Sequence, residues 1–338
     1  MESKATATTI SIVNKGNFET VLLNLAPTEE QHRIVTKIET LFSELDKGIE
    51  SFKTAREQLK IYRQARLKHA FSGKLSEQWR AEMRDNIPLR DVIPTEDLLR
   101  RIQTERGQRY QQQLKDWETG GKQGVKPEAP KTLPSLTAEE LAELPELPSG
   151  WAWFLMGDIC FESILGKMLD KKKNKGELKP YLRNINVRWG KFTFENLLEM
   201  GFEESEFARY GLEDGDLVIC EGGEPGRCAV WRKEFGQNMQ IQKAFHRIRF
   251  TQSINATFVQ MYIEFCTSNH KLEKMFTVTT IKHLTGEKLA RMTVPICSIN
   301  EQNQILFELE SKFSEIDQLD QTLSTGNCQN ICRLNVNL

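Results

Sequence analysis

One stretch of this chain occurs twice, 271 residues apart. Residues 30–46 read EQHRIVTKIETLFSELD and residues 301–317 read EQNQILFELESKFSEID, so eight of seventeen positions are identical. The match extends upstream without a gap to Thr8, which aligns with Thr279. Because such a repeat marks one structural unit, we expect the chain to hold the last piece of one unit and then a complete unit. A chance resemblance between two amphipathic helices is the alternative.

The first copy of the repeat opens a long apolar pattern. Alternating steps of four and three residues connect Ile34, Ile38, Leu41, Leu45, Gly48, Phe52, Ala55, Leu59, Tyr62 and Arg66. This spacing is typical of a coiled-coil seam, and no proline interrupts it before Pro88. We therefore expect one helix over residues 28–80, about 80 Å long at roughly 1.5 Å per residue.

Such a helix has to bury its stripe against a partner. The second copy, which opens a helix over residues 297–325, is the candidate antiparallel partner, and a helix lying on a globular core is the alternative. We expect the helix interface to contain Ile34, Ile38, Leu41, Leu45, Phe52, Leu59 and Tyr62. Residues 326–338 lack a heptad and are expected to form an irregular tail.

The composition of the chain changes after the long predicted helix. A helix is expected over residues 95–118 with Thr95 as its cap, followed by a Gly-, Lys- and Pro-rich linker and a short helix capped by Thr137. Residues 81–146 are thus a helical extension with a linker, and residues 1–27 are the remnant of a preceding domain. Residues 147–296 hold short apolar strands separated by glycine-rich turns and predict one mixed domain. The fold class expected for the whole chain is α+β.

The composition excludes several classes of protein. No stretch approaches 18 consecutive apolar residues, which argues against a membrane span, and no apolar leader follows the N-terminus, which favours a cytoplasmic protein. A net charge of −1 with 18 Phe and 6 Trp argues against disorder. The seven cysteines include no CxxC pair, so we expect reduced thiols and no metal site.

Catalytic motifs are not found. No phosphate-binding loop, serine elbow or HExxH zinc motif occurs. Asp170, Glu177 and Lys179 could hold Mg²⁺ as in a nuclease, and we keep this as the less favoured alternative. The run at Gly222, Gly223 and Gly226 carries neighbouring glutamates that would repel a phosphate, so it is interpreted as a strand connection.

Charge is distributed unevenly along the chain. Residues 147–296 carry 21 Lys and Arg against 18 Asp and Glu, a net charge of +3, whereas the remaining residues carry −4. A basic run contributes most of this excess: Lys171, Lys172, Lys173, Lys175, Lys179, Arg183 and Arg188. Basic loops neutralise DNA phosphates, and Asn184 and Asn186 could read base edges. A solvated lysine loop is the alternative that charge alone leaves open.

Four blocks of residues resemble one known family, the specificity (S) subunits of type I restriction–modification systems. The resemblance covers residues 8 to about 323, and these blocks carry it: Pro27-x-x-Glu30-Gln31 with Ala70-Phe71-Ser72-Gly73-Lys74-Leu75; Leu147-Pro148-Ser149-Gly150-Trp151; Pro180-Tyr181-Leu182-Arg183-Asn184; and Leu212-x-x-Gly215-Asp216 with Glu221-Gly222-Gly223. The resemblance implies that residues 147–296 are a target-recognition domain for half of a bipartite double-stranded DNA site. It also implies that the helices set the spacing and dock methyltransferase (M) subunits.

The resemblance further implies a non-catalytic chain. S-adenosylmethionine, ATP and Mg²⁺ would be bound by partner subunits, including a restriction (R) subunit, and this chain would bind no cofactor. The candidate DNA contacts are Lys171, Lys172, Lys173, Lys175, Arg183, Asn184, Arg188, Gly222, Gly223, Gly226, Arg227, Lys243 and Lys282. Only one complete recognition domain is expected, which indicates either a truncated product or a half-subunit that forms a homodimer. A protein-binding scaffold is the rival function.

Overall fold

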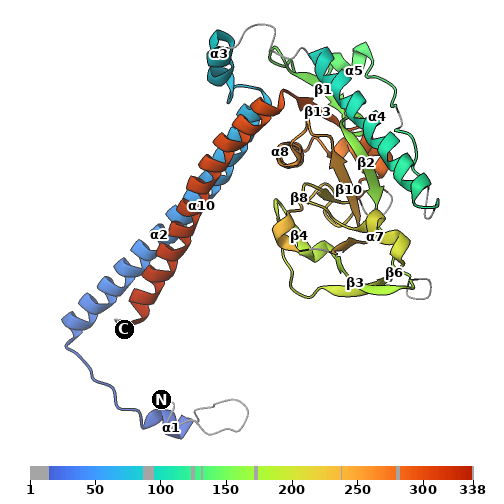
Figure 1. Ribbon diagram of the computed structural model, residues 1–338. Helices are drawn as coiled ribbons and strands as arrows, with labels where there is room; N and C mark the ends of the chain where they lie inside the picture. Colours follow the sequence, from blue (N-terminus) through green and yellow to red (C-terminus); the bar gives the residue numbers. More distant parts are fainter. Residues whose placement is uncertain are drawn as a thin grey trace. The chain divides into compact units, whose positions relative to one another are not determined.

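The computed structural model describes residues 15–86, 95–122, 126–130, 132–170, 174–236, 238–278 and 282–336. The chain divides into two compact units, which we call the helical unit (residues 1–58 with 320–338) and the mixed unit (residues 59–319). Two long helices, α2 (Thr28–Phe71) and α10 (Ile299–Val336), contribute to both units (Figure 1). A short helix, α1 (Lys15–Glu19), precedes α2.

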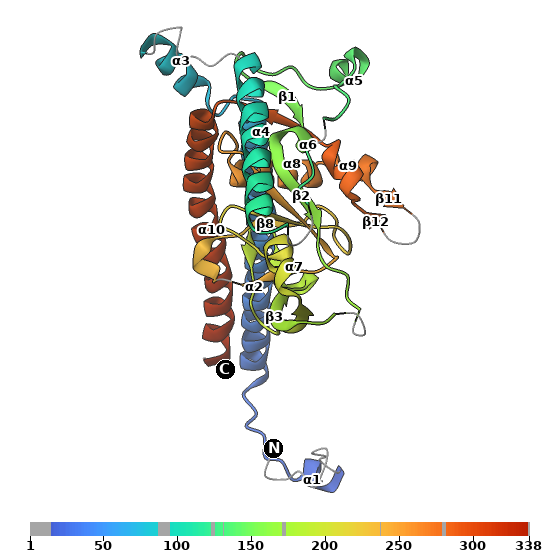
Figure 2. The same ribbon diagram turned by 45° about the vertical axis from the view of Figure 1, so that its right-hand side comes forward.

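Helices α2 and α10 lie side by side and antiparallel, as predicted (Figures 1 and 2). Within the helical unit, Arg56 Nε donates to Asp320 Oδ1 at 2.6 Å. Within the mixed unit, the Arg63 guanidinium lies 3.8 Å from the centre of the Phe313 ring. Arg63 therefore occupies the interface position predicted for Tyr62, and the prediction of Tyr62 is wrong because that side chain is 45% exposed.

The other predicted interface positions fall into two groups. Leu45, Phe52 and Leu59 are partly covered. The prediction of helix packing is wrong within this chain for the three positions nearest the start of α2, because their side chains are exposed: Ile34, Ile38 and Leu41.

Helix α2 ends earlier than the apolar pattern predicted. It stops at Phe71, and α3 (Glu77–Asn86) begins after a turn, so the expectation of one helix to residue 80 is wrong. Gly73 adopts a φ of +70°, and Lys74 N donates to His69 O at 3.0 Å. A left-handed glycine that closes the last turn in this way is a helix stop signal, and it ends α2 although no proline occurs before Pro88.

The end of α10 differs from prediction in the opposite sense. The irregular tail expected over residues 326–338 is wrong for the backbone, because α10 continues to Val336. No proline follows Ser298, and a single glycine costs a helix only about 1 kcal/mol. A helix that has already formed can therefore propagate through this polar sequence.

The mixed unit is built on four antiparallel strands in the order β2 (Cys160–Leu165), β10 (Phe245–Phe250), β7 (Leu217–Cys220) and β8 (Cys228–Val230). A second sheet has the order β6 (Leu198–Phe202), β3 (Glu177–Leu182) and β9 (Gln240–Ile241). Together with the helices, these sheets confirm the predicted α+β class.

Three strand pairs complete the unit. They are β1 (Ala152–Leu155) with β13 (Thr293–Ile296), β4 (Val187–Arg188) with β5 (Lys191–Phe192), and β11 (Thr277–Val278) with β12 (Lys282–His283). The remaining helices are α4 (Thr95–Thr119), α5 (Ala138–Ala142), α6 (Met156–Ile159), α7 (Glu204–Tyr210), α8 (Ala256–Ser268) and α9 (Gly286–Ala290). Short 3-10 turns cover Asn184–Asn186, Lys233–Phe235 and Glu273–Met275. Thr137 caps α5 through a reciprocal bond pair with Glu140, as predicted.

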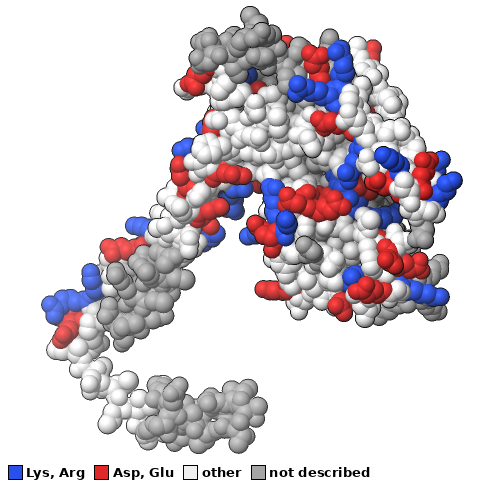
Figure 3. Space-filling model, in the orientation of Figure 1, with Lys and Arg blue, Asp and Glu red and all other residues white. Residues whose placement is uncertain are grey.

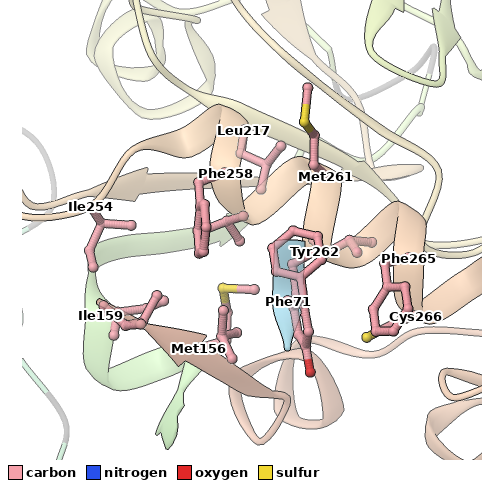
Figure 4. Close-up of a cluster of buried hydrophobic side chains, with 14 of the residues drawn as sticks. Phe71, Met156, Ile159, Leu217, Ile254, Phe258, Met261, Tyr262, Phe265 and Cys266 are labelled. Carbon is pink, nitrogen blue, oxygen red and sulfur yellow. The ribbon is translucent and has the colours of Figure 1, made fainter. Parts of the chain in front are cut away.

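The main core gathers around α8, which is apolar on most of its surface. Phe258, Tyr262 and Phe265 of α8 surround the ring of Phe71, at centroid distances between 5.1 and 5.7 Å (Figure 4). The end of α2 is thus anchored in the core of the mixed unit. Helix α4 also contributes, with Ile102 fully buried in the same cluster. The segment predicted as a separate extension is therefore packed onto the domain through α4.

Candidate nucleic-acid interface

The loop between β7 and β8, residues 221–227, is fixed by two neighbouring segments. Glu221 N donates to Ala244 O, and Leu284 N donates to Glu221 O, both at 2.8 Å. The loop is also closed on itself, because Gly226 N donates to Cys220 O at 3.0 Å. These backbone bonds hold the loop in one position at the end of the main sheet.

Arg227 ties this loop to a second one. Its side chain is 11% exposed, with Nη1 donating to Glu224 Oε2 at 2.6 Å and Nη2 donating to Asn184 O at 2.7 Å. Asn184 Nδ2 in turn lies 3.4 Å from Gly222 O. The contacts of Arg227 and Asn184 in this structure are thus with protein, and they set the relative position of the two loops.

The three predicted glycines have different roles in the loop. Gly223 has a φ of +78°, and a Cβ there would lie 3.2 Å from Asn184 Nδ2. A Cβ on Gly222 would lie 3.2 Å from the ring of His283. Gly226, with a φ of +92°, is buried, and a Cβ would lie 2.9 Å from Leu272 Cδ1. Gly226 therefore serves the packing of the domain, whereas Gly222 and Gly223 let neighbouring loops approach.

Three further predicted cations surround the loop. Lys243 is exposed and adjoins Ala244, which accepts the bond from Glu221. Lys282 is 54% exposed and adjoins His283, which bridges Gly222. Arg183 adjoins Asn184, and its Nη1 lies 3.4 Å from Asn196 O. One cluster thus contains seven predicted residues: Arg183, Asn184, Gly222, Gly223, Arg227, Lys243 and Lys282.

Other predicted cations lie outside this cluster. Arg188 is exposed on β4, opposite Lys191 of β5. This hairpin is linked to the loop by Trp189, whose Nε1 donates to Glu224 Oε1 at 2.9 Å. Lys175 precedes β3 and packs its backbone against Gly201 instead. Lys171, Lys172 and Lys173 lie outside the described residues.

Sequence reasoning missed three residues of this region: Trp189, Lys191 and His283. Trp189 and Lys191 flank the turn glycine of a two-residue hairpin, which is a signal that the sequence did offer. His283 had no such signal, because its contact with Gly222 comes from a segment 61 positions away in the chain. Trp189 is partly buried against the main core and lies beside exposed cations, and an indole next to cations is a suitable surface for a nucleic acid.

His246 fastens β12 to the main sheet beneath the loop. Its Nε2 donates to Leu284 O at 2.8 Å, and its side chain is almost fully buried. Burial lowers the pKa of His246 below its usual value, although the Leu284 carbonyl and the Glu221 carboxylate oppose this shift. The neutral imidazole is therefore the form that the fold prefers.

A buried charge network braces the same sheet. Arg249 Nε donates to Asp216 Oδ1 at 2.7 Å, and Arg247 Nη2 lies 2.8 Å from Glu162 Oε1. Burial raises the pKa of Asp216, and the bond from Arg249 acts in the opposite direction. Arg247 has no exposed surface, so these two arginines hold strands together and are not available to a ligand.

The charged surface in view is mixed. Figure 3 shows basic and acidic side chains interspersed over this face of the domain, with no broad basic field.

Of the alternative nuclease set, Lys179 Nζ donates to Glu177 Oε1 at 2.7 Å and lies 4.5 Å from the centre of the Phe207 ring. Within the described ranges, no cluster of three His, Cys, Asp or Glu side chains could hold a metal ion. No helix in the described part is long and apolar enough to span a bilayer.

Comparison with known proteins was made in sequence and in structure. No protein-family model matches the chain. The chain is 21% identical over 335 residues to the specificity subunit of the type I restriction enzyme EcoKI from Escherichia coli (strain K12). This alignment covers 96% of the chain and 58% of that subunit, so the chain spans less than two thirds of its relative.

Solved structures give the same answer for the fold. The chain matches, with a TM-score of 0.59 and 16% identity, a chain from a study of complex assembly and conformational transition of the type I R-M system, covering 97% of this chain and 62% of that one. It matches the HsdS subunit of Thermoanaerobacter tengcongensis with a TM-score of 0.53 and 16% identity, covering 99% and 64%. The chain is therefore similar in sequence, and alike in fold, to the specificity subunits of type I restriction–modification systems.

Proposed function

We propose that this chain is a DNA sequence-specificity component of a type I restriction–modification complex. Its recognition domain, residues 147–296, would bind half of a bipartite site on double-stranded DNA. The observation that carries the proposal is the alignment of 96% of the chain with a specificity subunit of this class. The shared fold supports it independently of the sequence match.

The loop cluster supplies the proposed DNA surface. Arg188, Lys191, Lys243 and Lys282 are the exposed cations around residues 221–227 and would neutralise phosphates. Arg227 and Asn184 would act by holding the loops in place, since their bonds are made within the protein. The surface would thus combine exposed cations with a bonded frame, which suits phosphate contacts that position a reading loop.

The chain itself would be non-catalytic. M subunits would dock on the helices, and they and a restriction subunit would hold S-adenosylmethionine, ATP and Mg²⁺. The apolar residues of α2 that remain exposed, Ile34 and Ile38 among them, would belong to the assembly surface. A Leu45→Asp variant is expected to weaken assembly with M subunits while leaving the recognition domain folded, as circular dichroism and co-purification would show.

The DNA proposal is tested on the assembled complex. The chain is combined with the M subunit of its own system, and binding to a duplex library is measured by gel shift over a series of salt concentrations. Arg188→Gln and Lys282→Gln should each weaken binding and reduce the slope of log K against log salt by about 1. Lys115→Gln on α4, an exposed lysine away from the loops, is the matched control and should change neither quantity.

Two outcomes would overturn the proposal. The first is a complex whose DNA binding is the same with or without this chain. The second is Mg²⁺-dependent DNA cleavage by this chain alone that is abolished by Glu177→Gln, which would favour the nuclease alternative.

A further inference from the structure

One acidic side chain, Glu224, lies beside the exposed cations of the β4–β5 hairpin. Its carboxylate is bound at both oxygens: Oε2 accepts from Arg227 Nη1 at 2.6 Å, and Oε1 accepts from Trp189 Nε1 at 2.9 Å. Arg188 and Lys191 flank Trp189 on the hairpin and are exposed. A carboxylate in this position repels an approaching phosphate, so its place on a DNA surface calls for an explanation.

The hairpin does not depend on Glu224 for its position. Gly190 N, at the turn of the hairpin, donates to Cys228 O of β8 at 3.0 Å. The side chain of Trp189 is partly buried and packs against the main core. The hairpin is therefore held by a backbone bond and by apolar contacts, and the bond from Trp189 to Glu224 is additional to them.

Arg227 is also held by a bond that does not involve Glu224. Its Nη2 donates to Asn184 O at 2.7 Å, which fixes the guanidinium from the opposite loop. Its Nε is buried and has no hydrogen-bond partner in the part of the chain that the structure describes. The guanidinium thus donates to Glu224 through one nitrogen only, and it stays in place if Glu224 leaves.

A permanent ion pair in the same domain is built differently. Arg249 donates to Asp216 through two nitrogens, from Nε to Oδ1 at 2.7 Å and from Nη2 to Oδ2 at 3.1 Å, and the Asp216 side chain is 1% exposed. The Glu224 side chain is 50% exposed. Ion pairs with an exposed partner contribute little to stability. Another anion can therefore replace Glu224 without disturbing the fold.

The two donors suit a phosphate as well as a carboxylate. Trp189 Nε1 and Arg227 Nη1 bind different oxygens of one carboxylate, and a phosphodiester likewise offers two oxygens on one atom. Because half of the Glu224 side chain is exposed, the space that its carboxylate fills is open to solvent. Rotation about the side-chain bonds of Glu224 empties that space. The loop backbone need not move, since Glu221 N and Gly226 N keep their bonds to Ala244 and Cys220.

We propose that Trp189 Nε1 and Arg227 Nη1 form a phosphate site that Glu224 occupies until a DNA phosphate displaces it. This role rests on the proposed DNA function and adds one contact to it. Arg227 holds the loops through Nη2 in both states and binds the phosphate through Nη1. A phosphate of a duplex that also contacts Arg188 is held close to the site, so it displaces Glu224 more readily than an isolated anion does.

The test uses the complex of this chain with the M subunit of its own system, and gel shifts over a series of salt concentrations. Glu224→Gln removes the charge that competes with the phosphate, and it should raise DNA affinity by about tenfold. In an Arg227→Gln background, Glu224→Gln should give no gain. Adding Arg227→Gln to Glu224→Gln should also reduce the slope of log K against log salt by about 1.

Two further variants make the test specific. Glu199→Gln is the matched control, because Glu199 is exposed on β6 and its substitution changes the net charge by the same amount. It should raise affinity by less than about twofold. Trp189→Phe keeps a ring against the core and removes the indole N–H, so in the Glu224→Gln background it should lower affinity by about threefold or more. This variant decides alone if the Arg227→Gln complex does not assemble.

The possible failures are distinguishable. A loss of affinity with Glu224→Gln would overturn the proposal, because it would show that the carboxylate only holds the loops together. Equal gains from Glu224→Gln and Glu199→Gln, or a gain that persists with Arg227→Gln, would also overturn it, since either result is a general effect of charge. In these cases DNA binding still depends on this chain. DNA binding that is the same with or without the chain would instead contradict the proposed function itself.

Discussion

The starts of α2 and α10 are alike in sequence and opposite in surroundings. Both open with Glu-Gln and share the same bond from glutamine to a preceding carbonyl. The start of α10 is buried under a helix end and a domain. The start of α2 is exposed over most of its apolar side chains. Local sequence thus determines the first turn of a helix, whereas contacts from distant segments determine how much its apolar residues stabilise the fold.

The largest expected effect separates the two apolar stripes directly. Leu309→Asp places a charge where no surface is exposed, and it should lower the free energy of unfolding by about 4 kcal/mol or more. Ile38→Asp, at the equivalent position of α2, should change it by less than about 1 kcal/mol, since Ile38 is 37% exposed. Urea unfolding followed by circular dichroism measures both. Equal losses would mean that the stripe on α2 is already covered.

Helix α2 allows a second comparison, between its middle and its end. A Cβ on Gly73 would lie 2.2 Å from Pro148 Cγ, in a residue with positive φ, so Gly73→Ala should destabilise the fold by about 2 kcal/mol or more. Gly48 lies in open helix with nothing within 4 Å of a Cβ, and Gly48→Ala should stabilise by about 0.5–1 kcal/mol. Thermal unfolding should therefore shift in opposite directions for the two variants.

Two arginines extend the comparison to the loops around residues 221–227. Arg227 is bonded to Glu224 and Asn184, whereas Arg188 is exposed on its hairpin. Arg227→Gln should cost about 1–2 kcal/mol of stability and also weaken DNA binding by the assembled complex. Arg188→Gln should weaken DNA binding alone. If both variants show the same loss of stability and the same loss of DNA affinity, the distinction between residues that hold the loops and residues that contact DNA is wrong.

The fold was predicted from the sequence where local signals were strong. The apolar spacing from Ile34 onward and the capping pair at Thr137 identified two helices. Strand β3 was missed because Pro180 and the charged residues Glu177 and Lys179 give it no clear apolar alternation. The stop at Gly73 was missed because no proline occurs before Pro88, although the glycine was visible.

Sequence reasoning named several residues that lie together in the candidate site, but it did not show the role of each one. The glycine run, Arg183 and Asn184 do lie together with Arg227. A sequence does not show whether an arginine is exposed or bonded to a carboxylate three residues away, so Arg227 and Arg188 could not be distinguished. The contact between Gly222 and His283 depends on tertiary structure alone, and no local pattern indicates it.

The smallest expected effect concerns the buried His246 as pH falls. His246 is buried with a lowered pKa, so the native state binds fewer protons than the unfolded chain. Its contribution to stability is complete above the unfolded pKa of about 6.5 and is lost as pH falls through the native pKa, at about 1.4 kcal/mol for each unit of difference.

His246→Gln should therefore flatten the loss of stability between about pH 7.5 and about pH 5.5, while lowering stability at the higher pH through the lost bond to Leu284. Urea unfolding at both pH values provides the measurement. The same slope in wild type and His246→Gln would show that the buried imidazole accepts a proton without opening the β12 segment, and that its burial contributes nothing to the pH dependence of the fold.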